Sequence, residues 1–279
     1  MLSHQEIMHF RAFGFVVLPG LFTADEITRL HAEVTTELRA AFGGIGTSPD
    51  ETGGIPGDYL PLAVDRAPFC QALIADDPRL FQGAAELCGA MVVPTPGVAT
   101  CFTGSETPWH TDQGPDIGGV KFLVHLEPRT AATGALRVVP GSHEPGLARR
   151  LASYWAVDPG RQGFPAWPVP AVVLETQPGD AIAFDLHLYH AAENLGGGKR
   201  PAWSIEYLPW PGLGDPEKIC VVRDLLVDAG EYDGYDRTRW PSWQEWACGA
   251  GSVRSRDLAV DRLRLLGVLT AQGATGEQR

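Results

Sequence analysis

The segment WHTDQG places the imidazole of His110 two positions before the carboxylate of Asp112. On an extended chain, residues i and i+2 point to the same face, so both groups can approach one ion. A second imidazole, His190, follows an apolar strand in GDAIAFDLHLYHAAEN. Two imidazoles and one carboxylate form the facial triad of non-haem Fe(II) sites, which leaves three coordination positions open. We therefore predict that His110, Asp112 and His190 bind a metal and are the catalytic residues.

Each of these residues can also be interpreted without a metal. An HxD pair arises by chance in many chains, and His110 or Asp112 taken alone is interpreted as a surface or hydrogen-bonded core residue. The order HxD, PGSH, GD, His and Arg is what favours a metal site. His187 competes for the third position, but on a regular strand it would face away from His190, which we therefore prefer. The remaining histidines are expected in structural, turn or helix-surface positions: His4, His9, His31, His125 and His143.

Arg200 follows His190 by ten residues, in GGGKRPAWSIEY. The planar guanidinium group makes two parallel charge-assisted hydrogen bonds to a carboxylate, which suits the distal carboxylate of 2-oxoglutarate. Lys199 is expected to be solvated, because neighbours on a strand point to opposite faces. Thr107, three residues before His110, is a candidate for a further hydroxyl contact with the same co-substrate. Arg200 and Thr107 are thus the predicted cofactor-binding residues.

The elements that must position these groups are short strands separated by turns. Many short strands with Pro-Gly and Gly-Asp punctuation favour a sandwich or jelly roll. The segment 143–170 interrupts them and is predicted to be an insertion over one barrel mouth. The clearest strands cover 120–126, 134–139, 171–176, 180–184 and 202–208.

The flanking segments predict helices around this β region. Helices are expected at 3–13, at 24–42 with Thr23 as N-cap, and around 78–88, and a strand is expected within 14–22. The Gly- and Pro-rich stretch 43–62 is typical of a lid or binding loop. We predict one domain over 1–279, with an N-terminal part (1–88), a jelly-roll core (about 89–210) and a helical C-terminal tail (239–272).

The composition indicates which binding partners and which cellular compartment to expect. The chain has 22 Lys and Arg against 34 Asp and Glu, a net charge of −12, and no basic cluster. Nucleic acid and anionic membranes are poor partners for such a surface, so a small-molecule substrate is expected. Five scattered cysteines indicate reduced thiols in a cytoplasmic protein. No apolar run approaches the roughly 20 residues of a membrane span, and nothing indicates an oligomeric state.

Four motifs together resemble the phytanoyl-CoA dioxygenase family of Fe(II)- and 2-oxoglutarate-dependent oxygenases. They are FRAFGFVVLPGLFTADEI, WHTDQG, GALRVVPGSH, and GDAIAFDLHLYHAAEN followed by Arg200, and the similarity covers about residues 5–210. The resemblance implies a mainly β fold with flanking helices and a double-stranded β-helix (jelly-roll, cupin-like) core. It also implies Fe(II) on His110, Asp112 and His190, with the C5 carboxylate of 2-oxoglutarate on Arg200.

The activity implied by this resemblance is an O₂-dependent oxidation that releases succinate and CO₂. Related halogenases carry a small residue at the position of Asp112, so the aspartate favours oxygenation, most simply hydroxylation. The absence of a basic cluster argues against a CoA thioester and favours a small soluble metabolite of natural-product biosynthesis. Candidate substrate-wall residues, which could equally be hydrophobic cover, are Tyr59, Trp155, Phe164, Trp167 and Trp210.

Two positions depart from the family pattern. Many relatives carry serine two residues after the distal histidine, where this chain has Ala192, and some other 2-oxoglutarate oxygenases carry serine at the position of Ala202. The secondary hydrogen bonds to the co-substrate must therefore come from other side chains. Two alternative functions stay open: a cupin-like metal-dependent isomerase or hydrolase that uses no 2-oxoglutarate, and a non-catalytic jelly-roll binding protein.

Overall fold

The computed structural model of the chain describes residues 1–46, 57–62, 67–95, 97–104, 106–114, 118–156 and 169–210, with isolated residues between 216 and 265. Within these residues the strands form two antiparallel sheets. The larger sheet has the order β1 (Phe15–Leu18), β9 (Ala181–Asp185), β6 (Val120–His125), β11 (Arg200–Pro209), β4 (Val98–Phe102) and β2 (Gly57–Pro61), and β3 (Val92–Pro94) also pairs with β11. The smaller sheet has the order β5 (Glu106–His110), β10 (His190–Glu193), β7 (Leu136–Val138) and β8 (Val172–Leu174).

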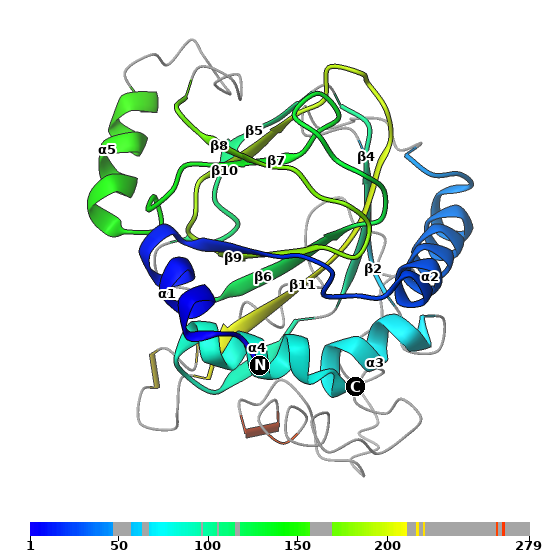
Figure 1. Cartoon of the computed structure of the whole chain (residues 1–279), viewed down its shortest axis with the longest axis horizontal. Coiled ribbons are helices and arrows are strands. Elements are labelled where there is room, and N and C mark those ends of the chain that lie inside the picture. Colours follow the sequence, from blue (N-terminus) through cyan, green and yellow to red (C-terminus); the bar gives the residue numbers. More distant parts are fainter. Residues whose placement is uncertain are drawn as a thin grey trace, which may run out of the picture.

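Helices cover the outer side of the larger sheet, and the smaller sheet lies on its other side (Figure 1). In the described residues the helices are α1 (His4–Phe13), α2 (Ala24–Phe42), α3 (Pro68–Asp76), α4 (Pro78–Cys88) and α5 (Pro145–Ala156). Helix α4 contacts β3, β6 and β11, while α2 contacts β2, β4 and β11. Helix α5 lies near the smaller sheet, at the edge of the view in Figure 1.

Helix α2 shows how local sequence sets these elements. Thr23 caps its N-terminus in a capping box with Glu26, and Gly43 ends it in the left-handed conformation at φ 71°. Its buried residues recur at helical spacing and include Ile27, Leu30, Val34 and Leu38. The helix therefore has one apolar face, which packs into the core against the larger sheet.

The predicted strands and helices are confirmed, with three differences. The stretch 43–62, predicted as a lid or binding loop, contains β2, which pairs with β4, so the expectation of a loop is wrong for Gly57–Pro61. The insertion 143–170 begins with α5, and α3 was not predicted. The predicted tail 239–272 falls almost entirely outside the described residues, so the single-domain assignment stays a prediction. Within the described residues, no helix is long and apolar enough to cross a membrane.

Two apolar clusters hold the layers together. The larger lies between the helices and the larger sheet and includes Leu30, Phe122 and Trp203. The smaller joins the two sheets and consists of Phe15, Leu136, Val138, Leu174, Ile182, Phe184 and Leu188. Because this second cluster draws on both sheets, it sets how they lie relative to each other.

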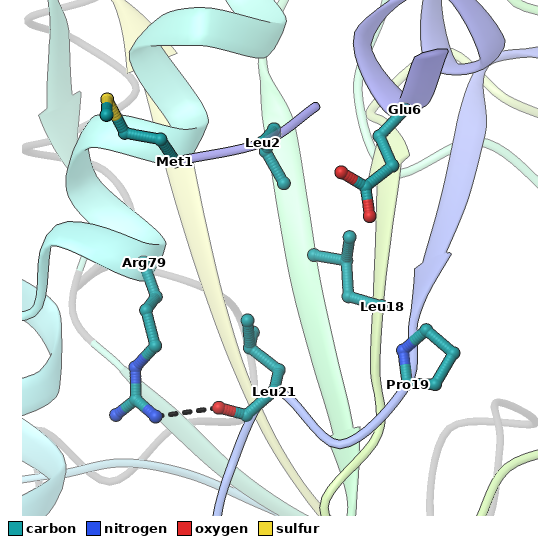
Figure 2. Close-up of a pocket in the computed structure, with 7 residues that line it drawn as sticks. All are labelled: Met1, Leu2, Glu6, Leu18, Pro19, Leu21 and Arg79. Atoms are coloured by element: carbon teal, nitrogen blue, oxygen red, sulfur yellow. Dashed lines mark hydrogen bonds between the residues drawn. The ribbon is translucent and has the colours of Figure 1, made fainter. Parts of the chain in front are cut away.

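Arg79 ties the helical layer to the chain that follows β1. Its guanidinium donates to the carbonyl of Leu21 at 2.6 Å (Figure 2) and to Glu26 at 2.6 Å, and it also pairs with Asp77, the N-cap of α4. The hollow beside it is lined by N-terminal residues such as Leu2. With its carboxylate partners in place, Arg79 acts here as a structural cation.

The packing of α2 gives a stability prediction. Leu30 is fully buried, so Leu30→Ala should lower the free energy of unfolding by roughly 2–5 kcal/mol through lost transfer energy and a residual cavity. Leu195→Ala is the matched control, because Leu195 is 74% exposed and its truncation should change the value by no more than about 0.5 kcal/mol. Urea denaturation measures both, and equal effects of the two variants would contradict the assigned core.

Candidate metal centre

The two histidines of the predicted triad are direct cross-strand partners on the smaller sheet. Strand β10 pairs with β5 in a register that sets His190 opposite His110, and their ring centroids are 4.2 Å apart. Directly opposed residues in an antiparallel pair point to the same face, so both imidazoles enter the space between the sheets. The pairing therefore brings together two groups that are eighty positions apart in the sequence.

Each imidazole is held so that its Nε2 atom faces the site. The Nδ1 atom of His110 lies 2.8 Å from the carbonyl oxygen of Pro108, and Nδ1 of His190 lies 2.9 Å from that of Leu188. A carbonyl oxygen only accepts, so Nδ1 carries the proton in both rings and Nε2 keeps a free lone pair. Metal-binding histidines are typically fixed in this way by a hydrogen bond from the other ring nitrogen.

Asp112 completes the group from just beyond the end of β5. Its Oδ1 atom lies 3.8 Å from Nε2 of His110 and 3.6 Å from Nε2 of His190. The ligand atoms of the three residues all lie within 4.8 Å of one another, which is compatible with a single ion. The backbone amide of Asp112 donates to the carbonyl of Leu186 at 3.0 Å, so this contact with the turn before β10 places the carboxylate.

The ionisation states suit metal binding. Burial alone would raise the pKa of Asp112, but Lys121, His190 and His110 together outweigh it and lower the pKa to about 2. Burial, followed by the nearby His110, lowers the pKa of His190 to about 4. Near neutral pH the site therefore offers one carboxylate and a neutral imidazole at His190, which are forms that bind a divalent cation.

Arg200 and Thr107, the two predicted cofactor-binding residues, meet beside this group. Arg200 Nη2 donates to the hydroxyl of Thr107 at 3.2 Å. Thr107 pairs in register with Ala192, the position at which many relatives carry serine. The hydroxyl of Thr107 thus lies next to the site of the missing serine and is available for a secondary hydrogen bond.

Within the described part of the chain, the buried guanidinium of Arg200 has no carboxylate partner. Arg200 is only 5% exposed, and its Nε atom has no hydrogen-bond partner among the described residues. Burial, followed by the positive charge of Arg129, lowers the pKa of Arg200 to about 10. A buried cation of this kind is stabilised by a carboxylate partner, so the donor set fits the distal carboxylate of a bound diacid.

Gly134 leaves room for the arginine. It has φ of +90°, and a Cβ atom built on it would overlap the Cδ atom of Arg200. The stem of Arg200 therefore passes directly over the glycine backbone, which requires a residue without a side chain. Gly134 is the first residue of the strand predicted at 134–139, and no local pattern connects it with Arg200.

The other histidines lie outside the group. His187 is in the turn between β9 and β10, where its Nε2 is 2.9 Å from the carbonyl of Gly114. A turn, and not strand alternation, separates it from His190, whose ring nitrogen belongs to the group of ligand atoms. His125 is buried and bonds Thr176 at 2.9 Å, as expected of a structural residue. His143 lies in a turn near the carbonyl of Arg11.

Two charged residues beside Asp112 were not among the predicted site residues. Lys121 on β6 and Glu206 on β11 form an ion pair at 3.2 Å, and Lys121 also contacts Asp112. The available signal was a charged residue within each of two mainly apolar strands, VKFLVHL and AWSIEYL. Such residues in a central strand need a partner, and each is the other's partner.

Three of the candidate substrate-wall residues lie within the described part of the chain. Tyr59 is on β2, opposite Thr100 of β4, while Trp210 packs against the larger core cluster. Trp155 on α5 stacks on Trp109, with ring centroids 6.3 Å apart. The other two, Phe164 and Trp167, lie outside the described residues.

Comparison with known proteins identifies the family that the sequence motifs resemble. The family model for phytanoyl-CoA dioxygenase matches residues 10–202. Ectoine dioxygenase of Bordetella parapertussis is 29% identical over 154 residues, which is 51% of this chain and 50% of that protein. The chain therefore spans about half the length of the curated relatives it matches.

Solved structures agree on the fold. HygX from Streptomyces hygroscopicus, with nickel and 2-oxoglutarate bound, has a TM-score of 0.59 and 19% identity, covering 75% of this chain and 88% of that one. The non-haem α-ketoglutarate-dependent carbocyclase SnoK from nogalamycin biosynthesis has a TM-score of 0.58 and 20% identity, covering 77% and 89%. These matches confirm the predicted double-stranded β-helix fold.

The close approach at Gly134 generates a prediction about ligand binding. Gly134→Ala should displace the Arg200 side chain and strain the backbone, and therefore raise the Kd for 2-oxoglutarate of the metal-loaded protein. Gly146→Ala is the control, because nothing lies within 4 Å of a Cβ at that position. Isothermal titration calorimetry measures both variants, and wild-type affinity in Gly134→Ala would contradict the role assigned to the glycine.

Proposed function

The chain belongs to the phytanoyl-CoA dioxygenase family, and on this basis we propose that it is an Fe(II)- and 2-oxoglutarate-dependent dioxygenase. The proposed reaction is the oxidation, most simply the hydroxylation, of a small soluble metabolite in natural-product biosynthesis. One observation carries it: three metal-type ligand atoms lie within 4.8 Å of one another, beside a buried arginine that has no carboxylate partner among the described residues. The metal ligands would be His110, Asp112 and His190.

One set of residues would hold the metal, and another would bind the co-substrate. Fe(II), once bound with 2-oxoglutarate, supplies O₂-dependent oxidation of a C–H bond with release of succinate and CO₂. The backbone carbonyls of Pro108 and Leu188 hold the two imidazoles with Nε2 toward the metal. Arg200 would anchor the distal carboxylate of the co-substrate, and Thr107 would add a hydroxyl.

The aspartate at position 112 supports oxygenation as the outcome. A carboxylate ligand there occupies a coordination position that a halide would need in a halogenase. The net charge of −12 without a basic cluster supports a substrate other than a CoA thioester. Among the similar structures, HygX with hygromycin B and SnoN with nogalamycin RO hold small natural products. Free thiols at the four described cysteines support a reducing, cytoplasmic compartment.

The proposed reaction makes a direct prediction. The full chain, reconstituted anaerobically with Fe(II), should consume 2-oxoglutarate and O₂ and release succinate when supplied with a suitable metabolite from a panel. His110→Ala should abolish this turnover, because it removes one of three ligands. His4→Ala is the matched control, since His4 is exposed at the start of α1.

Two results would count against the proposal. Unchanged turnover in His110→Ala would reject the metal centre. Conversion of a substrate with bound metal but without 2-oxoglutarate would instead support the cupin-like isomerase or hydrolase. Oxygen uptake and succinate release, measured together, separate these outcomes from the proposed one.

The arginine anchor is tested separately from the metal. Arg200→Met keeps the length of the side chain but removes the charge, and the loss of such a buried charge partner costs roughly 2–5 kcal/mol. The Kd for 2-oxoglutarate should therefore rise about 30-fold or more, with metal affinity little changed. Lys199→Met removes the same charge from an exposed neighbour and should leave the Kd unchanged. An unaffected Kd in Arg200→Met would reject the anchor.

A further inference from the structure

A buried lysine holds the carboxylate ligand from behind. The ammonium group of Lys121 lies 3.3 Å from Oδ2 of Asp112, whereas the two imidazoles lie on the side of Oδ1, at 3.8 and 3.6 Å. The two oxygens of one carboxylate therefore have different partners: one faces the metal position, and the other is bound to a cation of the protein.

Lys121 is itself held rigidly. It lies on β6, which pairs with β9 on one side and β11 on the other, and its cross-strand partner on β11 is Glu206. The carboxylate of Glu206 accepts from the ammonium group at 3.2 Å. The side chains of Lys121, Glu206 and Asp112 are 17%, 19% and 13% exposed, so the three charges form one mostly buried cluster.

We propose that Lys121 is a positioning residue of the metal centre, which binds Oδ2 of Asp112 so that Oδ1 alone is presented to the metal. This inference rests on the proposed function, because it needs a metal on His110, Asp112 and His190. A carboxylate that coordinates through one oxygen uses one position, whereas a chelating carboxylate uses two. Holding Oδ2 on Lys121 would therefore leave a coordination position of the metal available for 2-oxoglutarate and O₂.

Glu206 offsets the positive charge of Lys121, so the pair leaves the net charge beside Asp112 unchanged. Lys121 and Glu206 form an ion pair that adds no net charge to the site, so a bound metal would still experience the full charge of Asp112. Removing Lys121 without Glu206 makes the surroundings of Asp112 more negative, and this change in charge by itself would strengthen the binding of a cation. Loss of the orienting hydrogen bond acts in the opposite direction, and such outer partners typically account for 10- to 100-fold in metal affinity.

The test separates orientation from charge. The variants are Lys121→Met and the double variant Lys121→Met/Glu206→Gln, which has the same net charge as the wild type but lacks the ammonium group. Lys199→Met is the control, because it removes an exposed lysine elsewhere. Each full-length, metal-free protein is titrated with Co(II) by calorimetry, and the visible spectrum of the Co(II)-loaded protein reports coordination number. Thermal unfolding of the metal-free proteins verifies that each variant folds.

We expect both Lys121 variants to bind Co(II) 10- to 100-fold more weakly, with an altered Co(II) spectrum, and the control to match the wild type. A double variant with the affinity and spectrum of the wild type would overturn the inference, as would tighter binding in Lys121→Met. Failure of the wild type to bind Co(II), or undiminished binding in His110→Ala, would instead reject the metal centre on which the proposed function depends.

Discussion

The pairing of β5 with β10 is the contact on which the site depends. Its register sets His110 opposite His190, and the antiparallel geometry directs both rings into the same space. A shift by one residue would send one imidazole to the outer face, so the register cannot vary without loss of the ligand set. The amide of Asp112, bound to the carbonyl of Leu186, fastens the third ligand to the same pair of segments.

Charges in the site fall into two classes. Asp112, Lys121 and Glu206 form a group in which each cation or anion already has an opposite partner. Arg200 differs, because burial lowers its pKa and the like charge of Arg129 lowers it further. Among the described residues it has a hydroxyl partner, Thr107, but no carboxylate, which suits an anionic ligand at that position.

Local patterns were enough to predict most of the described elements and to select three residues whose ligand atoms the fold brings together. The cap Thr23 and the apolar spacing after it predicted helix α2, and short apolar runs separated by turn residues predicted the strands of the β region. Strand β2 was missed because its segment is rich in glycine and proline, and its strand character comes from pairing with β4. Strand propensity read from a sequence cannot include such a non-local partner.

The supporting residues of the site could not be predicted for the same reason. Gly134 and Arg200 are far apart in the sequence and meet only because the stem of the arginine crosses the glycine backbone. Lys121 and Asp112 are nine positions apart, but their contact depends on the turn at Leu186 as well as on β6. A motif names the groups that can do chemistry, whereas the contacts that orient them arise from tertiary packing.

The site also depends on how the two sheets are held together. The histidines belong to the smaller sheet, whereas Arg200, Lys121 and Glu206 belong to the larger. The distance between the metal position and the co-substrate anchor is therefore set by the cluster that joins the sheets, in which Val138 is the cross-strand neighbour of His190 on the side away from His110. Close-packed cores transmit small volume changes, so this cluster acts on the geometry of the site as well as on stability.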